Sequence, residues 1–272
     1  MARGTSHAAR HMPTVLTIAG SDSCAGAGIQ ADLKTFAAHG VYGTSALTAV
    51  TAQNTRGVVS WQALPPALVR QQIDAVADDI GADAVKIGML ANAEIVAAVA
   101  AAIRTLKLPN VVLDPVMIAK GGHRLLEEKA VDAIRTSLLP LAHAVTPNVP
   151  EAEVLSGVSI RSLKDMREAG QRILAMGPGV VLVKGGHLEG PESVDLAVTT
   201  TGIFELRGRR IETTSTHGTG CTLASAIAAN LALGLPTHGA LTRAREYVEG
   251  AILHAPGIGG GHGPLNHFWR LY

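Results

Sequence analysis

Short apolar runs alternate with helical patterns along this chain, and the alternation constrains the fold more than any other feature. Residues 15–19 form an apolar run that ends at Gly20. Residues 29–39 then carry apolar side chains three or four positions apart and stop at Gly40, which predicts a helix. Strands that are apolar throughout are expected where helices cover both faces of a sheet. The pattern therefore predicts a mostly parallel sheet with right-handed crossovers.

The same alternation continues to the end of the chain. Further strands are expected at residues 41–49, 84–87, 111–113, 144–145 and 180–183. Helices are expected at residues 66–78, 93–106, 127–138, 163–176, 222–233 and 241–253. Residues 194–213 contain strand-like runs broken by glycine, which predict an antiparallel extension. The expected fold class is α/β, a three-layer α/β/α sandwich with a mostly parallel central sheet and an antiparallel edge extension.

The domain organisation expected from the sequence is simple. Residues 13–272 contain no low-complexity linker and no internal repeat, so we expect them to form a single domain. Residues 1–12 have no apolar periodicity, and we expect them to be a disordered leader or an expression tail.

Charge and composition exclude several classes of partner. Lys and Arg number 23 against 22 Asp and Glu, and aromatic residues make up only 3% of the chain. Such a chain offers neither a broad basic face nor many stacking platforms for nucleic acid. No apolar run is long enough to span a membrane, and the start lacks the apolar stretch of a signal peptide. The two cysteines, Cys24 and Cys221, suit a reducing compartment, so a cytoplasmic location is expected.

Residues 26–31 match the dinucleotide-binding fingerprint G-x-G-x-x-G/A after a predicted strand. The fingerprint also needs an acidic residue about 20 positions further on, and residues 50–54 contain none. This absence argues against a dinucleotide site, although the glycines can still let a ligand approach the backbone. The chain has no P-loop and no H-E-x-x-H or C-x-x-C metal motif.

The strongest local signal for chemistry is the sequence THGTGC at residues 216–221, directly before a predicted helix. Gly218, Thr219 and Gly220 can turn successive N–H groups toward one point, and the helix start adds partial positive charge. The result is an anion hole for a phosphoryl group, in which we expect the pKa of the Cys221 thiol to be lowered. The alternative is a helix start with Cys221 as a small core residue. His217 is either functional or a loop histidine with satisfied hydrogen bonds.

Polar residues follow three more predicted strands. Asp114 ends the strand at 111–113, and Lys184 ends the strand at 180–183. Asn148 and Glu151 open a helix about one turn apart and offer oxygen ligands for hydrated Mg²⁺. Open α/β sheets bind ligands at this edge. The alternatives are turn chemistry at Asp114, a solvated Lys184, and an ordinary helix cap at Asn148 with Glu151 in the first turn.

Taken together, these segments resemble the hydroxymethylpyrimidine/phosphomethylpyrimidine kinases of thiamine biosynthesis, within the ribokinase-like superfamily. The resemblance runs through nearly the whole chain. The matching stretches are 17–23 (TIAGSDS), 26–36 (GAGIQADLKTF), 51–55 (TAQNT), 86–90 (KIGML), 114–117 (DPVM), 146–148 (TPN), 150–153 (PEAE), 183–187 (VKGGH), 217–223 (HGTGCTL) and 261–268 (GHGPLNHF).

The resemblance implies a kinase that uses ATP and Mg²⁺ to phosphorylate 4-amino-5-hydroxymethyl-2-methylpyrimidine and then its monophosphate. It also implies a homodimer. Gln53 would read the aminopyrimidine, in a pocket shaped by Gly20, Asp32, Met89 and Val116. The phosphoryl group would lie on Gly218, Thr219 and Gly220, and Cys221 stands where the superfamily usually has a catalytic aspartate. Glu151 and Asp114 would hold Mg²⁺, and Asn148, Asp114 and Lys184 would contact nucleotide phosphates.

Two other functions remain open from the sequence. A pyridoxal kinase of the same superfamily also acts on a hydroxymethyl heteroaromatic compound. A non-catalytic pyrimidine-binding module is the alternative outside enzymology, but Cys221, Glu151 and Asp114 are all present. The chain departs from the resembled pattern at Cys24 and Ala25, where the family usually has Ser-Gly, so the shape of this loop is expected to differ.

Overall fold

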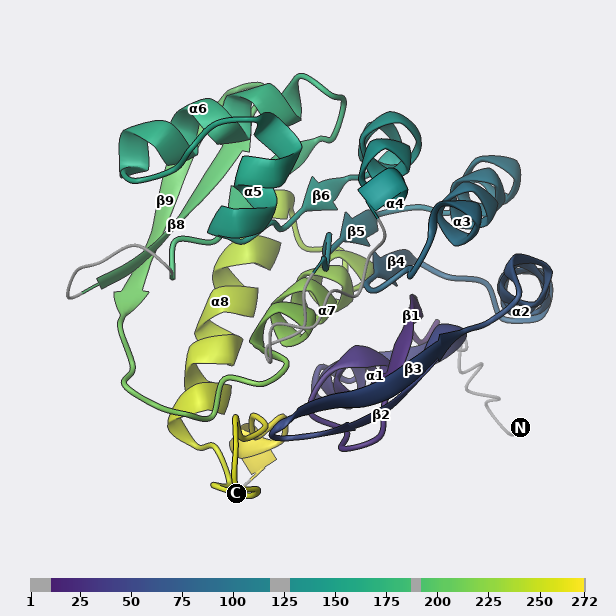
Figure 1. Ribbon diagram of the computed structural model, residues 1–272, viewed down its shortest axis with the longest axis horizontal. Coiled ribbons are helices and arrows are strands. Elements are labelled where there is room, and N and C mark those ends of the chain that lie inside the picture. The colour runs from purple at the N-terminus through teal and green to yellow at the C-terminus, as the bar shows by residue number, and fades with distance from the viewer. Residues whose placement is uncertain (1–10, 118–127, 187–191, 272) are drawn as a thin grey trace, which may run out of the picture.

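A computed structural model describes residues 11–117, 128–186 and 192–271, and a nine-stranded sheet forms its centre (Figure 1). The strand order is β3-β2-β1-β4-β5-β6-β7-β8-β9. The strands are β1 (Thr14–Asp22), β2 (Tyr42–Asn54), β3 (Gly57–Ala63), β4 (Ala84–Ile87), β5 (Val111–Leu113), β6 (Ala144–Val145), β7 (Val180–Val183), β8 (Glu192–Thr199) and β9 (Gly202–Arg209). The six strands from β2 to β7 in this order are parallel, whereas β3, β8 and β9 pair antiparallel at the two edges.

Helices cover both faces of the sheet (Figure 1). One face carries α2 (Pro66–Asp79), α3 (Ala93–Leu106), α4 (Glu128–Ala133), α5 (Val149–Ser156) and α6 (Leu163–Leu174). The other carries α1 (Gly28–Ala38), α7 (Thr219–Ala232) and α8 (Thr237–Leu253). Neighbouring strand residues such as Val111 and Val112 point into opposite cores, and both are buried. This two-sided burial explains why the parallel strands are apolar at every position.

The prediction of a mostly parallel sheet with an antiparallel extension is therefore confirmed, and β4, β5, β6 and β7 have the predicted bounds. The structure corrects several other boundaries. The second strand continues to Asn54 and forms a hairpin with β3, which the sequence analysis missed. The helix expected at 127–138 changes to a π-helical turn at Ile134–Leu138, and residue 127 lies outside the described residues. Helices α7 and α8 begin three and four residues earlier than predicted.

The strand order of the sheet determines where a ligand can bind. The chain passes from β1 to β2 on one side and then returns to place β4 on the other side of β1, so the strand order reverses there. Open α/β sheets bind ligands outside the carboxyl ends of strands at such a point. Gly20, Met89, Asp114, Asn148 and Lys184 lie at or just beyond these strand ends and all line one cavity.

Residues 1–10 of the expected leader lie outside the described residues, and His11 Nε2 lies 3.0 Å from Asp83 Oδ2. Within the described parts of the chain, no helix combines the length and the apolar character needed to cross a membrane.

Candidate active site

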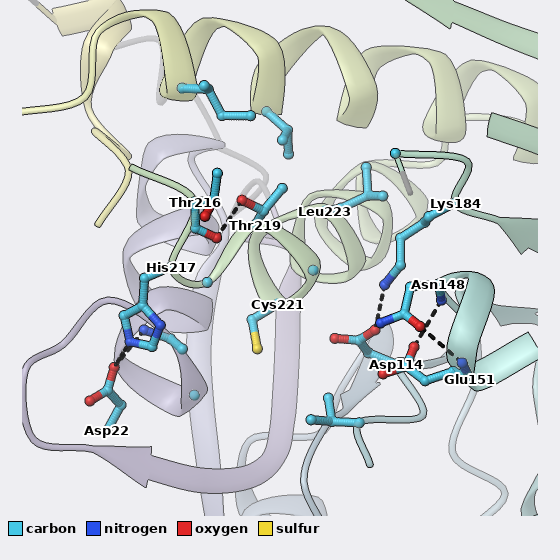
Figure 2. Close-up of a pocket in the computed structure, with 18 of the residues that line it drawn as sticks. Asp22, Asp114, Asn148, Glu151, Lys184, Thr216, His217, Thr219, Cys221 and Leu223 are labelled. Carbon is cyan, nitrogen blue, oxygen red and sulfur yellow. Dashed lines mark hydrogen bonds and ion pairs between the residues drawn. The ribbon is translucent and has the colours of Figure 1, made fainter. Parts of the chain in front are cut away.

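A cavity of about 530 Å³ opens at the carboxyl edge of the parallel strands, below the start of α7. Figure 2 shows two polar groups on its walls, with Cys221 between them. His217 and Asp22 form one group, and Asp114, Lys184, Asn148 and Glu151 form the other. The structure thus brings together residues that are up to 195 positions apart in the sequence.

The glycine turn at the start of α7 packs against the loop after β1. Gly218 is the N-cap of α7 with φ of +80°, and a Cβ atom there would come within 1.8 Å of the Gly26 carbonyl oxygen. A Cβ atom on Gly28 would lie 2.4 Å from the Gly20 carbonyl oxygen. Close backbone packing between these two loops therefore requires glycine at both positions.

Helix geometry leaves the N–H groups of the first turn of α7, at Gly220 and Cys221, without acceptors inside the helix. The Thr219 hydroxyl is committed to the Thr216 carbonyl at 2.8 Å. A Cβ atom on Gly220 would lie 3.3 Å from Lys184 Nζ and 3.4 Å from Asp114 Oδ2, so both charged groups come close to this turn. Backbone N–H groups and an ammonium thus face the same space, as an anion hole requires.

The expectation that the pKa of Cys221 is lowered is wrong. Removal from bulk water raises the pKa of this thiol to about 11, and the carboxylates of Asp32 and Asp114 add to the increase. The Lys86 ammonium and a hydrogen bond from the Gly28 backbone oppose it without reversing it. The field of the helix start favours the thiolate, but burial and two carboxylates from distant segments outweigh it.

Asp114 and Lys184 form an ion pair at the cavity wall. Lys184 Nζ lies 3.0 Å from Asp114 Oδ1, which also accepts a hydrogen bond from the Thr146 hydroxyl at 3.2 Å. Burial would lower the pKa of Lys184, but Asp114 and Glu151 hold it above its usual value. The lysine is therefore a fixed cation in the cavity rather than a solvated surface residue.

Asn148 and Glu151 form a capping box at the start of α5. The Asn148 side chain accepts from the Glu151 N–H at 2.9 Å, and Glu151 Oε2 accepts from the Asn148 N–H at 2.8 Å. The ordinary cap is thus confirmed, and it orients a buried carboxylate toward the cavity. Burial raises the pKa of Glu151 to about 7, since Asp114 repels the charge and Lys184 only partly offsets both effects.

Asp22 and His217 build the opposite wall, and the sequence analysis gave Asp22 no role. Asp22 Oδ2 lies 2.7 Å from His217 Nε2 and accepts the N–H groups of Gly26 and Ala27. Burial acts to raise the pKa of Asp22, but these donors hold it at about 2. Only a side chain 195 positions away completes this pair, so no local motif could have indicated it.

The residues that the resemblance assigned to the pyrimidine pocket separate into two sets. Gln53, Gly20, Met89 and Val116 line the cavity. Asp32 does not line it, so its predicted place in the pocket wall is wrong. It is fully buried and holds the hydroxyls of Thr17 and Ser225 and the ammonium of Lys86 at 2.6 to 2.9 Å. An aspartate with three such partners stabilises the cavity floor.

No role was predicted for three further residues that line the cavity, Lys86, Asp195 and Arg245. The Lys86 side chain is fully buried against Asp32, yet it contributes to the cavity lining. At the far end, Asp195 pairs with Arg245 and accepts the Gly185 N–H at 2.9 Å. This second pair fixes the turn that follows Lys184. The signal in the sequence was the KIGML stretch for Lys86, whereas Asp195 and Arg245 meet only through the fold.

An anion hole, a fixed ammonium and two buried carboxylates define a site for binding and transferring a phosphoryl group. Comparisons with known proteins agree with this class. A family model described as phosphomethylpyrimidine kinase matches residues 22–266. The chain is 50% identical to a hydroxymethylpyrimidine/phosphomethylpyrimidine kinase of Streptomyces coelicolor, over 95% of this chain and 96% of that protein. The chain belongs to the phosphomethylpyrimidine kinase family.

Two further relatives extend the comparison. The chain is 51% identical to a bifunctional thiamine biosynthesis protein of Geobacter sulfurreducens over 93% of this chain, and it spans about half of that protein, 52%. A Bacillus subtilis pyridoxal kinase solved as an ADP complex has a TM-score of 0.89 at 37% identity, covering 96% of this chain and 100% of that one. The expected ribokinase-like architecture is confirmed.

Proposed function

We propose that this protein is an ATP-dependent kinase that phosphorylates 4-amino-5-hydroxymethyl-2-methylpyrimidine and then its monophosphate, as part of thiamine biosynthesis. The observation that carries the proposal is the start of α7, where Lys184 Nζ lies beside Gly220, close to the first-turn N–H groups that have no acceptor inside the helix. Phosphoryl transfer needs negative charge to be neutralised, and these N–H groups together with the Lys184 ammonium can do this. We assign Gly218, Thr219 and Gly220 to the transferring group and Lys184 and Asn148 to nucleotide phosphates.

The pyrimidine would bind at the end of the cavity lined by Gln53, Gly20, Met89 and Val116. The Gln53 amide offers a donor and an acceptor, which complements the mixed edge of an aminopyrimidine, whereas a carboxylate would offer acceptors alone. A Cβ atom on Gly20 would come within 3.0 Å of the Met89 sulfur, so this wall is already tightly packed.

The oxygen ligands at the opposite wall fit Mg²⁺. Asp114 and Glu151 bring two buried carboxylates near one ammonium; burial raises the pKa of Glu151, and repulsion by Asp114 adds to the increase. Mg²⁺ prefers one or two carboxylates together with phosphate oxygens and water. We assign both carboxylates to Mg²⁺, which would neutralise phosphate charge when bound. The side-chain oxygen of Asn148 accepts the helix-cap hydrogen bond, so Asn148 would contact a nucleotide phosphate through its amide nitrogen.

Under this proposal, Cys221 acts differently in the two phosphorylation steps. The first acceptor is an alcohol that must lose a proton, whereas the second is a phosphate monoester that is largely ionised at neutral pH, since its second pKa is about 6. We assign the proton from the alcohol to Cys221. Because its pKa lies above neutrality in the ligand-free protein, the thiolate is a minor and strongly basic species.

A second candidate activity is pyridoxal phosphorylation. The similarity to a Bacillus subtilis pyridoxal kinase over nearly the full length of both chains favours testing it. The deciding experiment measures ADP release with the aminopyrimidine, its monophosphate and pyridoxal offered separately. We expect turnover of both pyrimidines and the highest kcat/KM with one of them. A higher kcat/KM with pyridoxal would contradict the proposal. The homodimer and the cytoplasmic location stay predictions.

A further inference from the structure

Lys86 is a buried cation that the mechanism above leaves unused. Its side chain is fully buried near the carboxyl end of β4, as is the side chain of Asp32 beside it. Asp32 Oδ2 lies 2.9 Å from Lys86 Nζ and is the one hydrogen-bond partner that the described residues give this ammonium. An ammonium has three N–H donors, so two of them can be given to a bound molecule. Because Lys86 lines the cavity, that molecule can be a substrate.

The Lys86 ammonium lies beside the wall that we assign to the pyrimidine. A Cβ atom on Gly88 would come within 2.8 Å of Lys86 Nζ and within 3.0 Å of Ala19 Cβ. Ala19 and Gly88 directly precede Gly20 and Met89 in the chain. The ammonium is therefore next to the two turns that shape this end of the cavity.

Groups assigned to phosphoryl transfer also lie close to Lys86. Burial acts to lower the pKa of this lysine, but Asp32, Cys221 and Asp114 hold it above its usual value. Lys86, Cys221 and Asp114 all line the same cavity. A permanent positive charge thus lies where the pyrimidine end of the cavity meets the phosphoryl end.

We propose that Lys86 is a further catalytic residue, whose ammonium donates a hydrogen bond to the acceptor oxygen of the substrate as this oxygen attacks the terminal phosphate of ATP. The inference rests on the proposed function. In the first step the alcohol oxygen forms a bond to the terminal phosphorus, the bond from that phosphorus to ADP breaks, and the alcohol proton goes to Cys221. Lys86 keeps its three protons. Negative charge builds up on the alcohol oxygen as its proton leaves, so the ammonium stabilises the transition state more than the bound alcohol.

Stability alone does not require the pair of Lys86 and Asp32. A buried ion pair can often be replaced by uncharged residues without loss of stability, whereas removal of one partner leaves a costly unpaired charge. A variant that changes both residues therefore separates folding from catalysis. Asn at position 32 can accept from the Ser225 hydroxyl and donate to the Thr17 hydroxyl, so the other contacts of Asp32 can be kept.

The test compares Lys86→Met with the double variant Asp32→Asn/Lys86→Met, by urea unfolding and by turnover of the aminopyrimidine with ATP. We expect Lys86→Met to unfold at a lower urea concentration than the wild type, and the double variant to regain most of this loss. The kcat of the stable double variant should nevertheless stay about 100-fold or more below that of the wild type. The KM for the aminopyrimidine should change much less, because the lost contact acts mainly in the transition state.

A third variant tests the ammonium itself. Lys86→Ala retains Asp32 and leaves space at the end of the cavity, so added propylammonium should restore part of kcat in a saturable way. Tetramethylammonium at the same concentration has no N–H donor and should not restore it. A stable double variant with wild-type kcat would overturn the proposal, as would a Lys86→Ala variant on which propylammonium has no effect.

Turnover by the wild type tests the proposed function separately from these comparisons. Pyridoxal also carries a hydroxymethyl group, so the kcat ratios between wild type and variants can be measured with whichever substrate the wild type accepts. A wild type that prefers pyridoxal would contradict the proposed function and still allow the role of Lys86 to be tested.

Discussion

Two buried carboxyl groups on opposite walls of the same cavity have opposite pKa shifts. Asp22 has four N–H donors around its oxygens, and its pKa is held at about 2 although burial acts to raise it. Burial, with repulsion by Asp114, raises the pKa of Glu151 to about 7. Lys184 and the backbone N–H groups of Asn148 and Met117 lower it, but they do not compensate. The Asp22 carboxylate is fully hydrogen-bonded and holds the loop after β1. The Glu151 carboxylate lacks enough positive charge around it, so a bound cation would stabilise it.

The first prediction concerns Cys221, which lies between the two walls. Cys221→Ala should slow phosphorylation of the alcohol by roughly 10²–10⁴-fold, because the proton acceptor is lost. Phosphorylation of the monophosphate should fall far less. Measuring the two half-reactions separately checks this, with Cys24→Ala as a control for loss of a thiol outside the cavity. Equal losses in both steps would show that Cys221 shapes the anion hole instead.

The second prediction concerns Glu151, whose pKa is raised. Glu151→Gln should lower kcat by about 100-fold, since a proposed Mg²⁺ ligand is lost. It should also stabilise the fold at pH 8 by about 2 kcal/mol. A carboxyl group whose folded pKa is raised loses stability as pH rises from its unfolded value through 7, and the amide avoids this cost. Urea unfolding at pH 5 and pH 8 measures the effect, with Glu153→Gln on the same helix as the control.

The third prediction concerns Asp22, where the expected change in the free energy of unfolding has the opposite sign. Asp22→Asn should destabilise the protein by about 2 kcal/mol at pH 7, because charge-assisted hydrogen bonds are lost. A depressed folded pKa contributes stability above the unfolded value of 3.8, and that contribution is lost as pH falls through about 2. The difference between wild type and variant should therefore shrink from pH 5 to pH 2 in urea unfolding. If Asp22→Asn stabilised the protein, the two carboxyl groups would not differ in the way proposed here.

Much of the sheet could be predicted because its strands are buried on both sides. The runs at β4, β5, β6 and β7 are apolar at nearly every position, and their bounds were correct. The β3 strand was missed because it lies at an edge, where Val59 is 78% exposed and the residues alternate less clearly. A sheet edge carries a weaker pattern than a sheet centre.

The site could be predicted where a motif ends a strand or starts a helix, as at Asp114, Lys184 and Gly218. It could not be predicted where partners meet only in the folded chain. Asp22 depends on His217, and the pKa of Cys221 depends on Asp32 and Asp114. Local electrostatic reasoning failed for Cys221 because desolvation is a property of the packed cavity.

The smallest predicted effect concerns Ala25, in the loop that follows β1 beside Asp22. Ala25 has φ of +61°, a left-handed conformation that favours glycine, at a position where the resembled family usually has glycine. Ala25→Gly should relieve this strain and stabilise the protein by about 0.5–1 kcal/mol, with little change in activity. Thermal unfolding checks this. A destabilised variant would indicate that the lost Ala side chain matters more than the backbone conformation.

A crystal structure with a non-hydrolysable ATP analogue and the aminopyrimidine tests the central claim most directly. We expect the terminal phosphate to lie within hydrogen-bond distance of the N–H groups of Gly220 and Cys221, with Lys184 Nζ beside it and the pyrimidine edge against Gln53. A terminal phosphate held at the Asp22–His217 wall, or away from the start of α7, would contradict the account.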